Sequence, residues 1–467
     1  MLRQMSVLIT SASLLGACAV GPDYRPPATP KAAAAPFQAA TPAVSAAAPE
    51  DRWWALYHDP VLDRLVADAL AANTDIRVAV ARLERARAAL RAGKADRLPQ
   101  TTLGASADYG RASLASTLPG YSRQTWTYDG GISLAYEADL FGRVSRGVEA
   151  ARADASAAAA DAASVRLQVA ADTVRAYLDA ITSAERMAVA RQTVALLDSS
   201  IRITSARFEV GRSDRLDVIR VTALRDQQAA TIPTLEADHE AALLRLATLT
   251  GRAPADLPAD IARQQATPGL AAPIPVGDGR QLLARRPDVR AAERRLAAAS
   301  ARIGIATADL YPRITLGGSA GATALSGMDV LGAGAARWAV GPAISWAFPN
   351  FAAVHARIGA ARADDAAALA SFDGTVLNAL EETERALSAY GHALEREETL
   401  GAARDAAARA ARISLARQRE GRIDFLDLLD AQRTLASAEA DLVAARRARA
   451  FAQVDVFRAL GGGWNAS

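Results

Sequence analysis

The sequence has little of what metal sites, disulfide frameworks and membrane-spanning helices require. Its 467 residues include one cysteine and four scattered histidines (His58, His239, His355 and His392). One cysteine excludes an internal disulfide framework and a metal site built from several thiolates. After the N-terminal leader, no run of 18 consecutive apolar residues occurs. We therefore expect no metal site, no cofactor and no transmembrane helix.

The charges argue against a nucleic-acid-binding protein. The 54 basic and 51 acidic residues are interspersed and leave a net charge of +3. No basic stripe with interleaved aromatic residues appears, as a nucleic-acid surface would need. Aromatic residues make up only 5% of the chain although hydrophobic residues reach 51%, because alanine is abundant. A composition rich in alanine, leucine, arginine and glutamate favours long helices.

The sequence also contains one motif that imitates a catalytic site. Residues 317–321 read Gly-Gly-Ser-Ala-Gly, which satisfies the Gly-x-Ser-x-Gly pattern of the nucleophile elbow. That elbow needs a turn from strand to helix, together with a base and an acid. Ser319 instead lies inside a segment that alternates like a strand. We therefore predict no catalytic residues and a chain that is not an enzyme.

The N-terminus resembles a bacterial lipoprotein signal peptide. A basic start at Arg3 precedes an apolar stretch over residues 7–17, and Leu-Gly-Ala-Cys ends at Cys18 as in a lipobox. The resemblance implies that residues 1–17 are removed, that the Cys18 thiol carries lipid, and that Ala19 directs sorting to the outer membrane. Residues 18–50 are rich in alanine and proline and predict an extended tether.

The rest of the chain contains an internal duplication. Ordered matches recur at an offset that drifts from 213 to 210: Asp75 with Asp288, Pro99 with Pro312, Asp154 with Asp364, Gly211 with Gly421, and Asp217 with Asp427. Such a series indicates a duplicated unit. We expect a first repeat over 51–251, a linker over 252–279, a second repeat over 280–460 and a tail over 461–467. Each repeat predicts a helix, two strands, a very long helix, a break and a return helix.

The four predicted strands have one apolar face and one face of small polar residues. They cover about 100–109, 125–137, 313–324 and 337–348, and their side chains alternate with a period of two. Strands of this length and pattern fit a membrane β-barrel. Four strands cannot close a barrel, and open edges are not tolerated in lipid, so several chains must build it together. Half of a soluble β-sandwich is the alternative, which the flanking long helices disfavour.

Two very long helices are predicted over about 144–208 and 351–417. At 1.5 Å per residue each spans about 100 Å. Apolar residues recur every seven positions along them, which indicates coiled-coil packing. Each helix breaks at Gly211 or Gly421 and is expected to return as a helix of about 35 residues. The result is two long αα-hairpins, each following a β-hairpin.

Five segments carry a resemblance to the TolC-like outer membrane factor family, in its lipoprotein efflux branch. The segments cover residues 18–27, 53–60, 139–143, 283–293 and 428–433, and they occur in order on the expected elements. The resemblance implies a mainly α protein with a membrane β-barrel: a homotrimer with twelve strands in the outer membrane and an α-helical tunnel through the periplasm. It also implies docking to a periplasmic adaptor (membrane fusion protein) and an inner-membrane pump.

The segment after the second hairpin turn predicts a gate. Asp427 and Asp430 share a helix face with Arg433, and in a trimer each aspartate becomes a ring of three negative charges. The resemblance points to the same carboxylates, with Leu426 at a hydrophobic constriction and Arg433 beside them. Charges that merely pair along an exposed helix are the alternative interpretation.

The first hairpin differs from the second at its tip. Asp217 keeps its place, whereas Arg220 replaces the second aspartate, and a pairing of Arg220 with an aspartate of the adjacent hairpin is one hypothesis. Phe208 fits the family pattern of an aromatic residue three positions before the turn glycine, but the second tip has Gln418 there. The tip residues that we expect to meet the adaptor are Arg207, Gly211, Arg417 and Gly421.

Three functions remain from the sequence alone. The first is an outer-membrane exit duct of a tripartite efflux pump, which the lipobox and residues 428–433 favour. The second is an outer-membrane duct for type I protein secretion. The third is a lipid-anchored coiled coil without a pore, against which the alternating strands argue.

Overall fold

The structure is a computed structural model that describes residues 19–28, 33, 35–39, 41–47, 51–116, 120, 122–256, 261, 268–270, 273–327 and 329–462. The predicted signal peptide and the lipidation site Cys18 lie outside the described residues. The chain divides into two compact units, and each is described by itself. Unit 1 comprises Met1–Pro27, Arg82–Ala159 and Ala291–Asp373, and unit 2 comprises Ala28–Ala81, Ala160–Arg290 and Gly374–Ser467.

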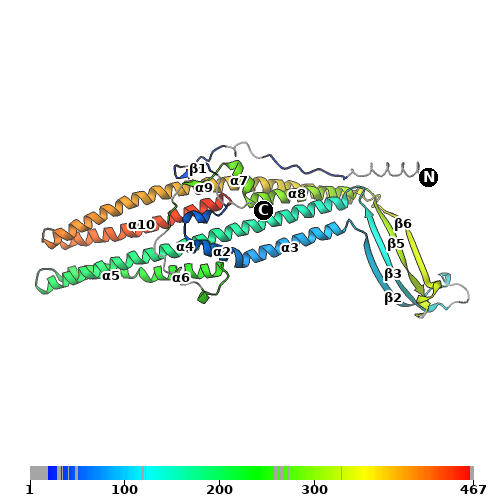
Figure 1. Cartoon of the computed structure of the whole chain (residues 1–467), viewed down its shortest axis with the longest axis horizontal. Coiled ribbons are helices and arrows are strands. Elements are labelled where there is room, and N and C mark those ends of the chain that lie inside the picture. Colours follow the sequence, from blue (N-terminus) through cyan, green and yellow to red (C-terminus); the bar gives the residue numbers. More distant parts are fainter. Residues whose placement is uncertain are drawn as a thin grey trace. The chain divides into compact units, whose positions relative to one another are not determined.

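Unit 1 contains a four-stranded antiparallel sheet (Figure 1). Its strands are β2 (Gln100–Arg111), β3 (Gln124–Ala138), β5 (Arg313–Ala324) and β6 (Ala336–Ser345), in the spatial order β2-β3-β5-β6. The register aligns Thr102 with Ser133 and Ser133 with Ser319, so the small polar residues of both repeats share one face. The fourth strand was predicted to reach residue 348 but ends at Ser345. Ser345 pairs with Arg313, the first residue of β5. Pro312 precedes Arg313, and the pairing of β5 with β6 ends there.

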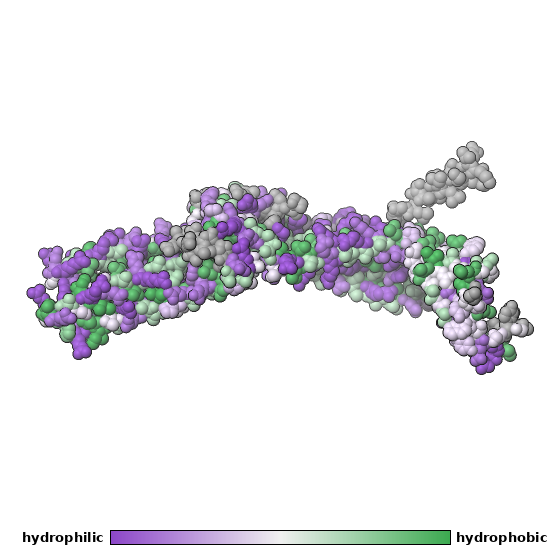
Figure 2. All heavy atoms as spheres, turned by 60° about the horizontal axis from the view of Figure 1, so that its bottom comes forward, coloured by the Kyte–Doolittle hydropathy of each residue, from purple (hydrophilic) through white to green (hydrophobic). Residues whose placement is uncertain are grey.

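The other face of the sheet is apolar and uncovered within the described chain. Leu103 is 83% exposed, Trp338 79% and Val340 78%, and Ile132, Leu316 and Ile344 share their face. Figure 2 shows this part of the molecule as green and pale, in contrast to the purple that is frequent along the helices. Strands β2 and β6 each have one edge with no partner strand in the sheet. An apolar face of this size between two open edges indicates that the sheet is completed by something outside the single chain.

A polar cap starts the first long helix, α4 (Arg143–Glu209). The carboxylate of Asp139 accepts hydrogen bonds from the backbone N–H groups of Val144 at 2.9 Å and Ser145 at 2.7 Å. Residues 19–27, predicted as part of an extended tether, contact this junction. Gly142 has φ 80°, and a Cβ there would meet Ala19, while Asp23 forms an ion pair with Arg146 at 2.7 Å. Residues 19–27 are therefore fixed to the start of α4.

The helices of unit 2 form two hairpins and a shared core. The elements are α2 (Pro60–Ala72), the start of α3 (Thr74–Ala95), most of α4, α5 (Arg215–Ala229), α6 (Ile232–Leu249), α7 (Gly279–Arg285), the start of α8 (Pro287–Ala308), most of α9 (Phe351–Arg419) and α10 (Phe425–Ala459). A two-stranded parallel sheet joins β1 (Val44–Ser45) to β4 (Ile274–Pro275). Trp53 and Phe457 stack at 4.7 Å and pack with the buried Tyr177 in the core. Within the described ranges, each helix is too short or too polar to span a lipid bilayer.

The return of the first hairpin departs from the prediction. A single helix of about 35 residues was expected in each repeat, and α10 has 35 residues. In the first repeat the return is divided into α5 and α6, which are separated at Ala230 and Thr231. Pro233 explains the break, because it has no N–H to donate and its ring excludes the carbonyl four residues earlier. The expectation of one continuous return helix was therefore wrong for the first repeat.

The duplication extends to individual tertiary contacts. Asn73 donates through Nδ2 to the carbonyl of Leu249 at 2.9 Å, and Arg286 donates through Nη1 to the carbonyl of Ala459 at 2.8 Å. These residues are related by the same offsets, 213 and 210, as the sequence repeat. In each case a side chain that precedes one helix binds an unsatisfied carbonyl at the end of the return helix. The contact holds the two ends of each repeat together.

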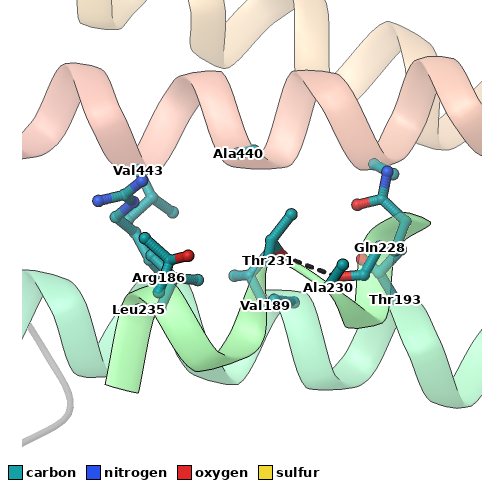
Figure 3. Close-up of a pocket in the computed structure, with 12 residues that line it drawn as sticks. Arg186, Val189, Thr193, Gln228, Ala230, Thr231, Leu235, Ala440 and Val443 are labelled. Carbon is teal, nitrogen blue, oxygen red and sulfur yellow. Dashed lines mark hydrogen bonds between the residues drawn. The ribbon is translucent and has the colours of Figure 1, made fainter. Parts of the chain in front are cut away.

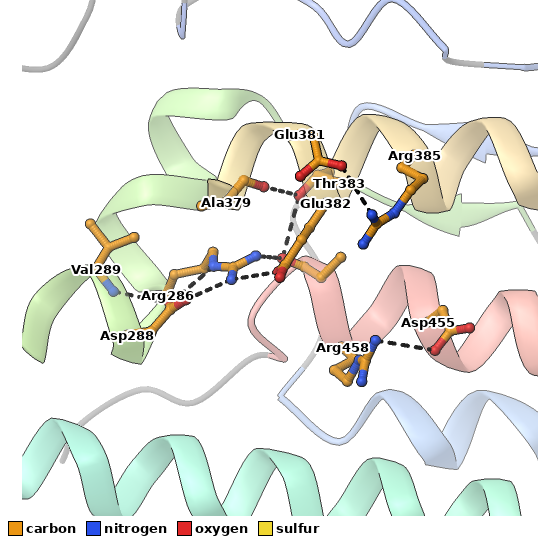
Figure 4. Close-up of polar contacts among 11 residues, drawn as sticks. Arg286, Asp288, Val289, Ala379, Glu381, Glu382, Thr383, Arg385, Asp455 and Arg458 are labelled. Carbon is orange, nitrogen blue, oxygen red and sulfur yellow. Dashed lines mark hydrogen bonds and ion pairs between the residues drawn. The ribbon is translucent and has the colours of Figure 1, made fainter. Parts of the chain in front are cut away.

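Arg286 also forms ion pairs with two carboxylates (Figure 4). The residue is 7% exposed, and its Nη2 lies 2.6 Å from Asp288 and 2.9 Å from Glu382. Burial alone lowers the pKa of Arg286, but the hydrogen bonds and charges of Asp288 and Glu382 outweigh it and raise the pKa above its usual value. Asn73 in the first repeat has no charge with which to do the same.

Replacing Arg286 tests whether this cluster stabilises unit 2. Arg286→Gln removes the cationic partner of two carboxylates and the shorter of two hydrogen bonds to the Ala459 carbonyl, and we expect a loss of about 1–3 kcal/mol. The readout is the temperature of helix unfolding, followed by circular dichroism at 222 nm. Arg385→Gln is the matched control, because Arg385 forms an exposed ion pair with Glu381. Equal unfolding temperatures for the two variants would show that the Arg286 contacts contribute nothing.

Candidate functional site

The two hairpin turns have the same backbone structure. Gly211 has φ 72° and Gly421 has φ 74°, a left-handed conformation that glycine adopts without strain. Arg212 N–H donates to the carbonyl of Arg207 at 2.8 Å, and Arg422 N–H donates to that of Arg417 at 2.9 Å. These are the hydrogen bonds of a glycine-terminated helix end. The sequence therefore specifies the turn twice, at the positions where the tips were predicted.

An aspartate begins each return helix. Asp214 accepts from the N–H of Leu216 at 2.9 Å, and Asp424 accepts from the N–H of Phe425 at 2.6 Å. Side-chain oxygens at this position satisfy N–H groups that have no partner within the helix. These caps fix where α5 and α10 begin, and they thereby fix which face carries the residues that follow.

The structure places the predicted gate residues on the surface of the second tip. Asp430 and Arg433 form an ion pair at 2.9 Å along one helix face, and both are exposed. Leu426 is also exposed, and in the described chain no ion pair forms at Asp427. Of the two predicted gate carboxylates, Asp430 is thus paired, whereas Asp427 has no cationic partner among the described residues.

Arg220 and Asp217 of the first tip form no ion pair with the second tip in the part of the chain that the structure describes. Within the described residues Arg220 has no ion pair, and Asp217 accepts a hydrogen bond from Ser213 at 3.0 Å. Arg220 instead lines a hollow of about 350 Å³ with Leu426, Leu429, Asp430 and Arg433. Asp430 is already neutralised by Arg433, which lies three residues away on its own helix and needs no second hairpin. The pairing of Arg220 with an aspartate of the adjacent hairpin therefore stays a prediction for the assembled tip.

An apolar cluster joins the two tips. Phe425 of α10 packs against Leu197 of α4 and against Val221 and Leu224 of α5, and all four are buried. Gln432 donates to the hydroxyl of Ser200 at 3.0 Å beside them. Phe425 was not among the predicted site residues, although its spacing to Leu428 and Leu429 gives an apolar stripe at helical period.

The residues three positions before the two turn glycines, Phe208 and Gln418, differ in burial. Gln418 occupies the position where the family pattern expects an aromatic side chain, and it is 7% exposed. Its carbonyl accepts from Arg207 of the first tip at 3.4 Å, whereas Phe208 is 43% exposed. Arg207 and Gln418 thus add a polar contact between the tips, next to the cluster around Phe425.

A cavity of about 440 Å³ lies farther from the tips, at the break between α5 and α6 (Figure 3). Arg186 and Val189 of α4 face Val443 of α10 across it, and Gln228 lies at the other end. Thr231 donates to the carbonyl of Gln228 at 2.7 Å and closes the turn between the two helices. The lining is apolar with one guanidinium, an amide and hydroxyls, which provides no nucleophile with a base.

The motif that imitates a nucleophile elbow lies within a strand. Ser319 is on the polar face of β5, where its register partners are Ser133 on β3 and Ala339 on β6. The turn from strand to helix that an elbow needs is absent at this position. Ser319 is therefore part of the polar face of the sheet and not of a catalytic site.

The fold and these sites define a class of protein, an outer-membrane channel. It combines a sheet whose apolar face needs lipid, a duplicated hairpin plan and two long helical hairpins with matching tips. The chain belongs to the outer membrane efflux protein family, whose model matches residues 65–252 and 279–462. The two matched segments correspond to the two repeats seen in the sequence, to within two residues at the ends where the match extends beyond a repeat.

Individual relatives resemble the chain over nearly its whole length. The outer membrane protein OprJ of Pseudomonas aeruginosa is 32% identical over 97% of this chain and 94% of its own. Nodulation protein T of Rhizobium leguminosarum bv. trifolii is 30% identical over 97% of this chain and 96% of its own. The solved outer-membrane channel OprN has a TM-score of 0.89 and 41% identity, and the match covers 96% of this chain and all of that one.

Family membership confirms several predictions made from the sequence. The resemblance to the outer membrane factors is confirmed, and so are the efflux-duct function, the outer-membrane location and the mainly α fold built from a duplicated unit. The family consists of channel proteins, so the chain is not an enzyme.

Removing the aromatic ring of Phe425 tests the cluster that joins the tips. Phe425→Ala leaves a cavity worth about 3 kcal/mol of local stability. We expect faster amide hydrogen exchange in residues 197–201 and 221–225, and unchanged exchange in the core around Trp53. Phe208→Ala is the control, because this second phenylalanine is half exposed. If the two variants exchange alike, Phe425 does not hold the tips together.

Proposed function

We propose that three copies of this chain form the exit duct of a tripartite efflux pump. The duct receives substrates from a periplasmic adaptor and an inner-membrane pump and conducts them passively across the outer membrane. Lipid on Cys18 anchors each copy, and the helical hairpins extend into the periplasm. The observation that carries the proposal is the exposed apolar face of a four-stranded sheet with two open edges.

The size of the sheet supports the number three. Edge strands in lipid must find partners, so β6 of one copy pairs with β2 of the next until the barrel closes. Two copies supply about eight strands, and a barrel of that size is filled by its own side chains. Three copies supply about twelve strands, which leaves an aqueous lumen for exported molecules. The polar face, rich in glycine, serine and threonine, lines that lumen and keeps it wide.

Thiol labelling tests which face lines the lumen. Cysteine is introduced singly on the polar face, at Thr102, Ser133 or Ser319, and on the apolar face, at Leu103, Leu134 or Ile344. A membrane-impermeant maleimide added to intact cells should label the first set and leave the second unlabelled. The parent chain is the control for background at Cys18. Labelling of the apolar set instead would contradict a barrel with a polar lumen.

The tips form the periplasmic gate of the proposed duct. Leu426, Asp427, Asp430 and Arg433 line its narrow end, and Asp217 and Arg220 line it from the first hairpin. Rings of carboxylates at a constriction concentrate cations and repel anions. The adaptor binds the tip residues Arg207, Gly211, Arg417 and Gly421 and opens the gate by separating the hairpins. The exposure of Asp427 and the small interface around Phe425 support this assignment.

Alanine variants of the gate carboxylates test it in planar bilayers. Asp427→Ala should reduce cation preference more than Asp430→Ala, because Arg433 already neutralises Asp430. The double variant should also raise basal conductance. Asp405→Ala, which removes an exposed carboxylate paired with Arg404 on α9, should change neither quantity. Unaltered conductance and selectivity in an intact double-variant trimer would remove these residues from the gate.

A further inference from the structure

An ion pair on the polar face of the sheet joins two strands that are not neighbours. Arg337 of β6 reaches across β5 to Asp129 of β3, and its Nη2 lies 2.7 Å from Oδ1 and 2.8 Å from Oδ2. On β5, the hydroxyl of Thr323 donates to Asp129 at 2.6 Å and accepts from Arg337 Nε at 2.9 Å. Asp129, Thr323 and Arg337 are called the cross-strand cluster below. Its bidentate geometry distinguishes it from ordinary surface pairs, which contribute little.

A row of glycines explains how the arginine spans the sheet. Arg337 stands opposite Gly321 of β5, Gly321 stands opposite Gly131 of β3, and Gly131 stands opposite Gly104 of β2. Because glycine has no side chain, nothing projects from the polar face at these three positions. Gly104 and Gly131 help to form a hollow of about 350 Å³ that Asp129 and Arg337 also line. The guanidinium therefore crosses the sheet next to open space.

The other charges of the polar face are accounted for in the described strands. By register, this face carries Asp108, Asp129, Glu137, Arg313 and Arg337. Glu137 pairs with Arg143, and Arg313 pairs with Asp309 at 2.7 Å, both at the helical end of the sheet. Asp108 accepts a hydrogen bond from Ser106 at 2.9 Å and, within the described residues, has no cationic partner. One carboxylate per chain is thus left uncompensated on this face.

We propose that the cross-strand cluster keeps this level of the lumen wall neutral and thereby limits the cation preference of the duct. This inference rests on the proposed function, in which the polar face lines an aqueous lumen. Asp129 and Arg337 cancel each other, and Asp108 remains as the charge of the wall. In a trimer, loss of either cluster partner converts a neutral level into a ring of three like charges. Exported molecules of either sign therefore pass the intact cluster without a barrier of charge.

Single substitutions on the two sides of the pair should have opposite effects. Arg337→Gln exposes a ring of Asp129, and we expect the potassium-to-chloride permeability ratio to rise by about threefold. Asp129→Asn exposes a ring of Arg337 and should lower the ratio by a similar factor. The double variant should return to the parent value. Reversal potentials in a potassium chloride gradient across planar bilayers give the ratio.

Three further variants make the result decisive. Arg337→Lys keeps the charge and should retain the parent ratio, and so should Arg111→Gln, which removes a cation from the apolar face of β2. Asp108→Asn leaves the cluster intact and should lower the ratio by about twofold, which tests the charge balance even if the cluster variants assemble poorly. Ratios that stay at the parent value in Arg337→Gln, Asp129→Asn and Asp108→Asn would overturn the proposal. A parent chain that forms no channel would contradict the proposed function instead.

Discussion

Hydrocarbon offers no hydrogen bonds to the edge of a β-sheet, and this constraint governs the architecture of the chain. Strands β2 and β6 each leave a row of N–H and C=O groups without a partner in the sheet, and the face between them exposes Leu103, Trp338 and Val340. A water-soluble chain would cover such a face. Here the sheet becomes a stable membrane structure only when copies of the chain satisfy each other's edges. The folded chain is therefore one part of a larger closed structure.

The scarcity of aromatic residues follows from the way the helices pack. Long helices that lie side by side approach closely when their contact residues are small, and the buried alanines of α4, such as Ala170, Ala171 and Ala180, serve this purpose. Among the helices, large side chains gather where both repeats meet, around Trp53, Tyr177 and Phe457. A single aromatic, Phe425, has the corresponding role between the tips. The apolar contacts between the hairpins there are few, which is consistent with hairpins that separate during function.

The two repeats share their backbone structure but differ in the charges at equivalent positions. Both tips end in a left-handed glycine, and both repeats bind the end of the return helix through a side chain. The residues at these equivalent positions differ, however: Asn73 is replaced by Arg286, and Arg220 is replaced by Asp430. The second repeat thus carries a buried arginine paired with two carboxylates at one end of its return helix and a second aspartate near the other end. A chain with two copies of one unit can keep the frame and specialise only one copy.

The sequence by itself determined the elements, because their causes are local. Alternation with a period of two specifies strands, glycines at 211 and 421 specify turns, and the drifting offset specifies the duplication. The break at Pro233 was also written in the sequence and was overlooked. Tertiary structure alone decided which side chains meet. The register of the strands brought Asp129 to Arg337 across 208 residues of chain, and the packing of two hairpins buried Phe425. Such contacts depend on distances between segments that lie far apart in the chain, which no local pattern encodes.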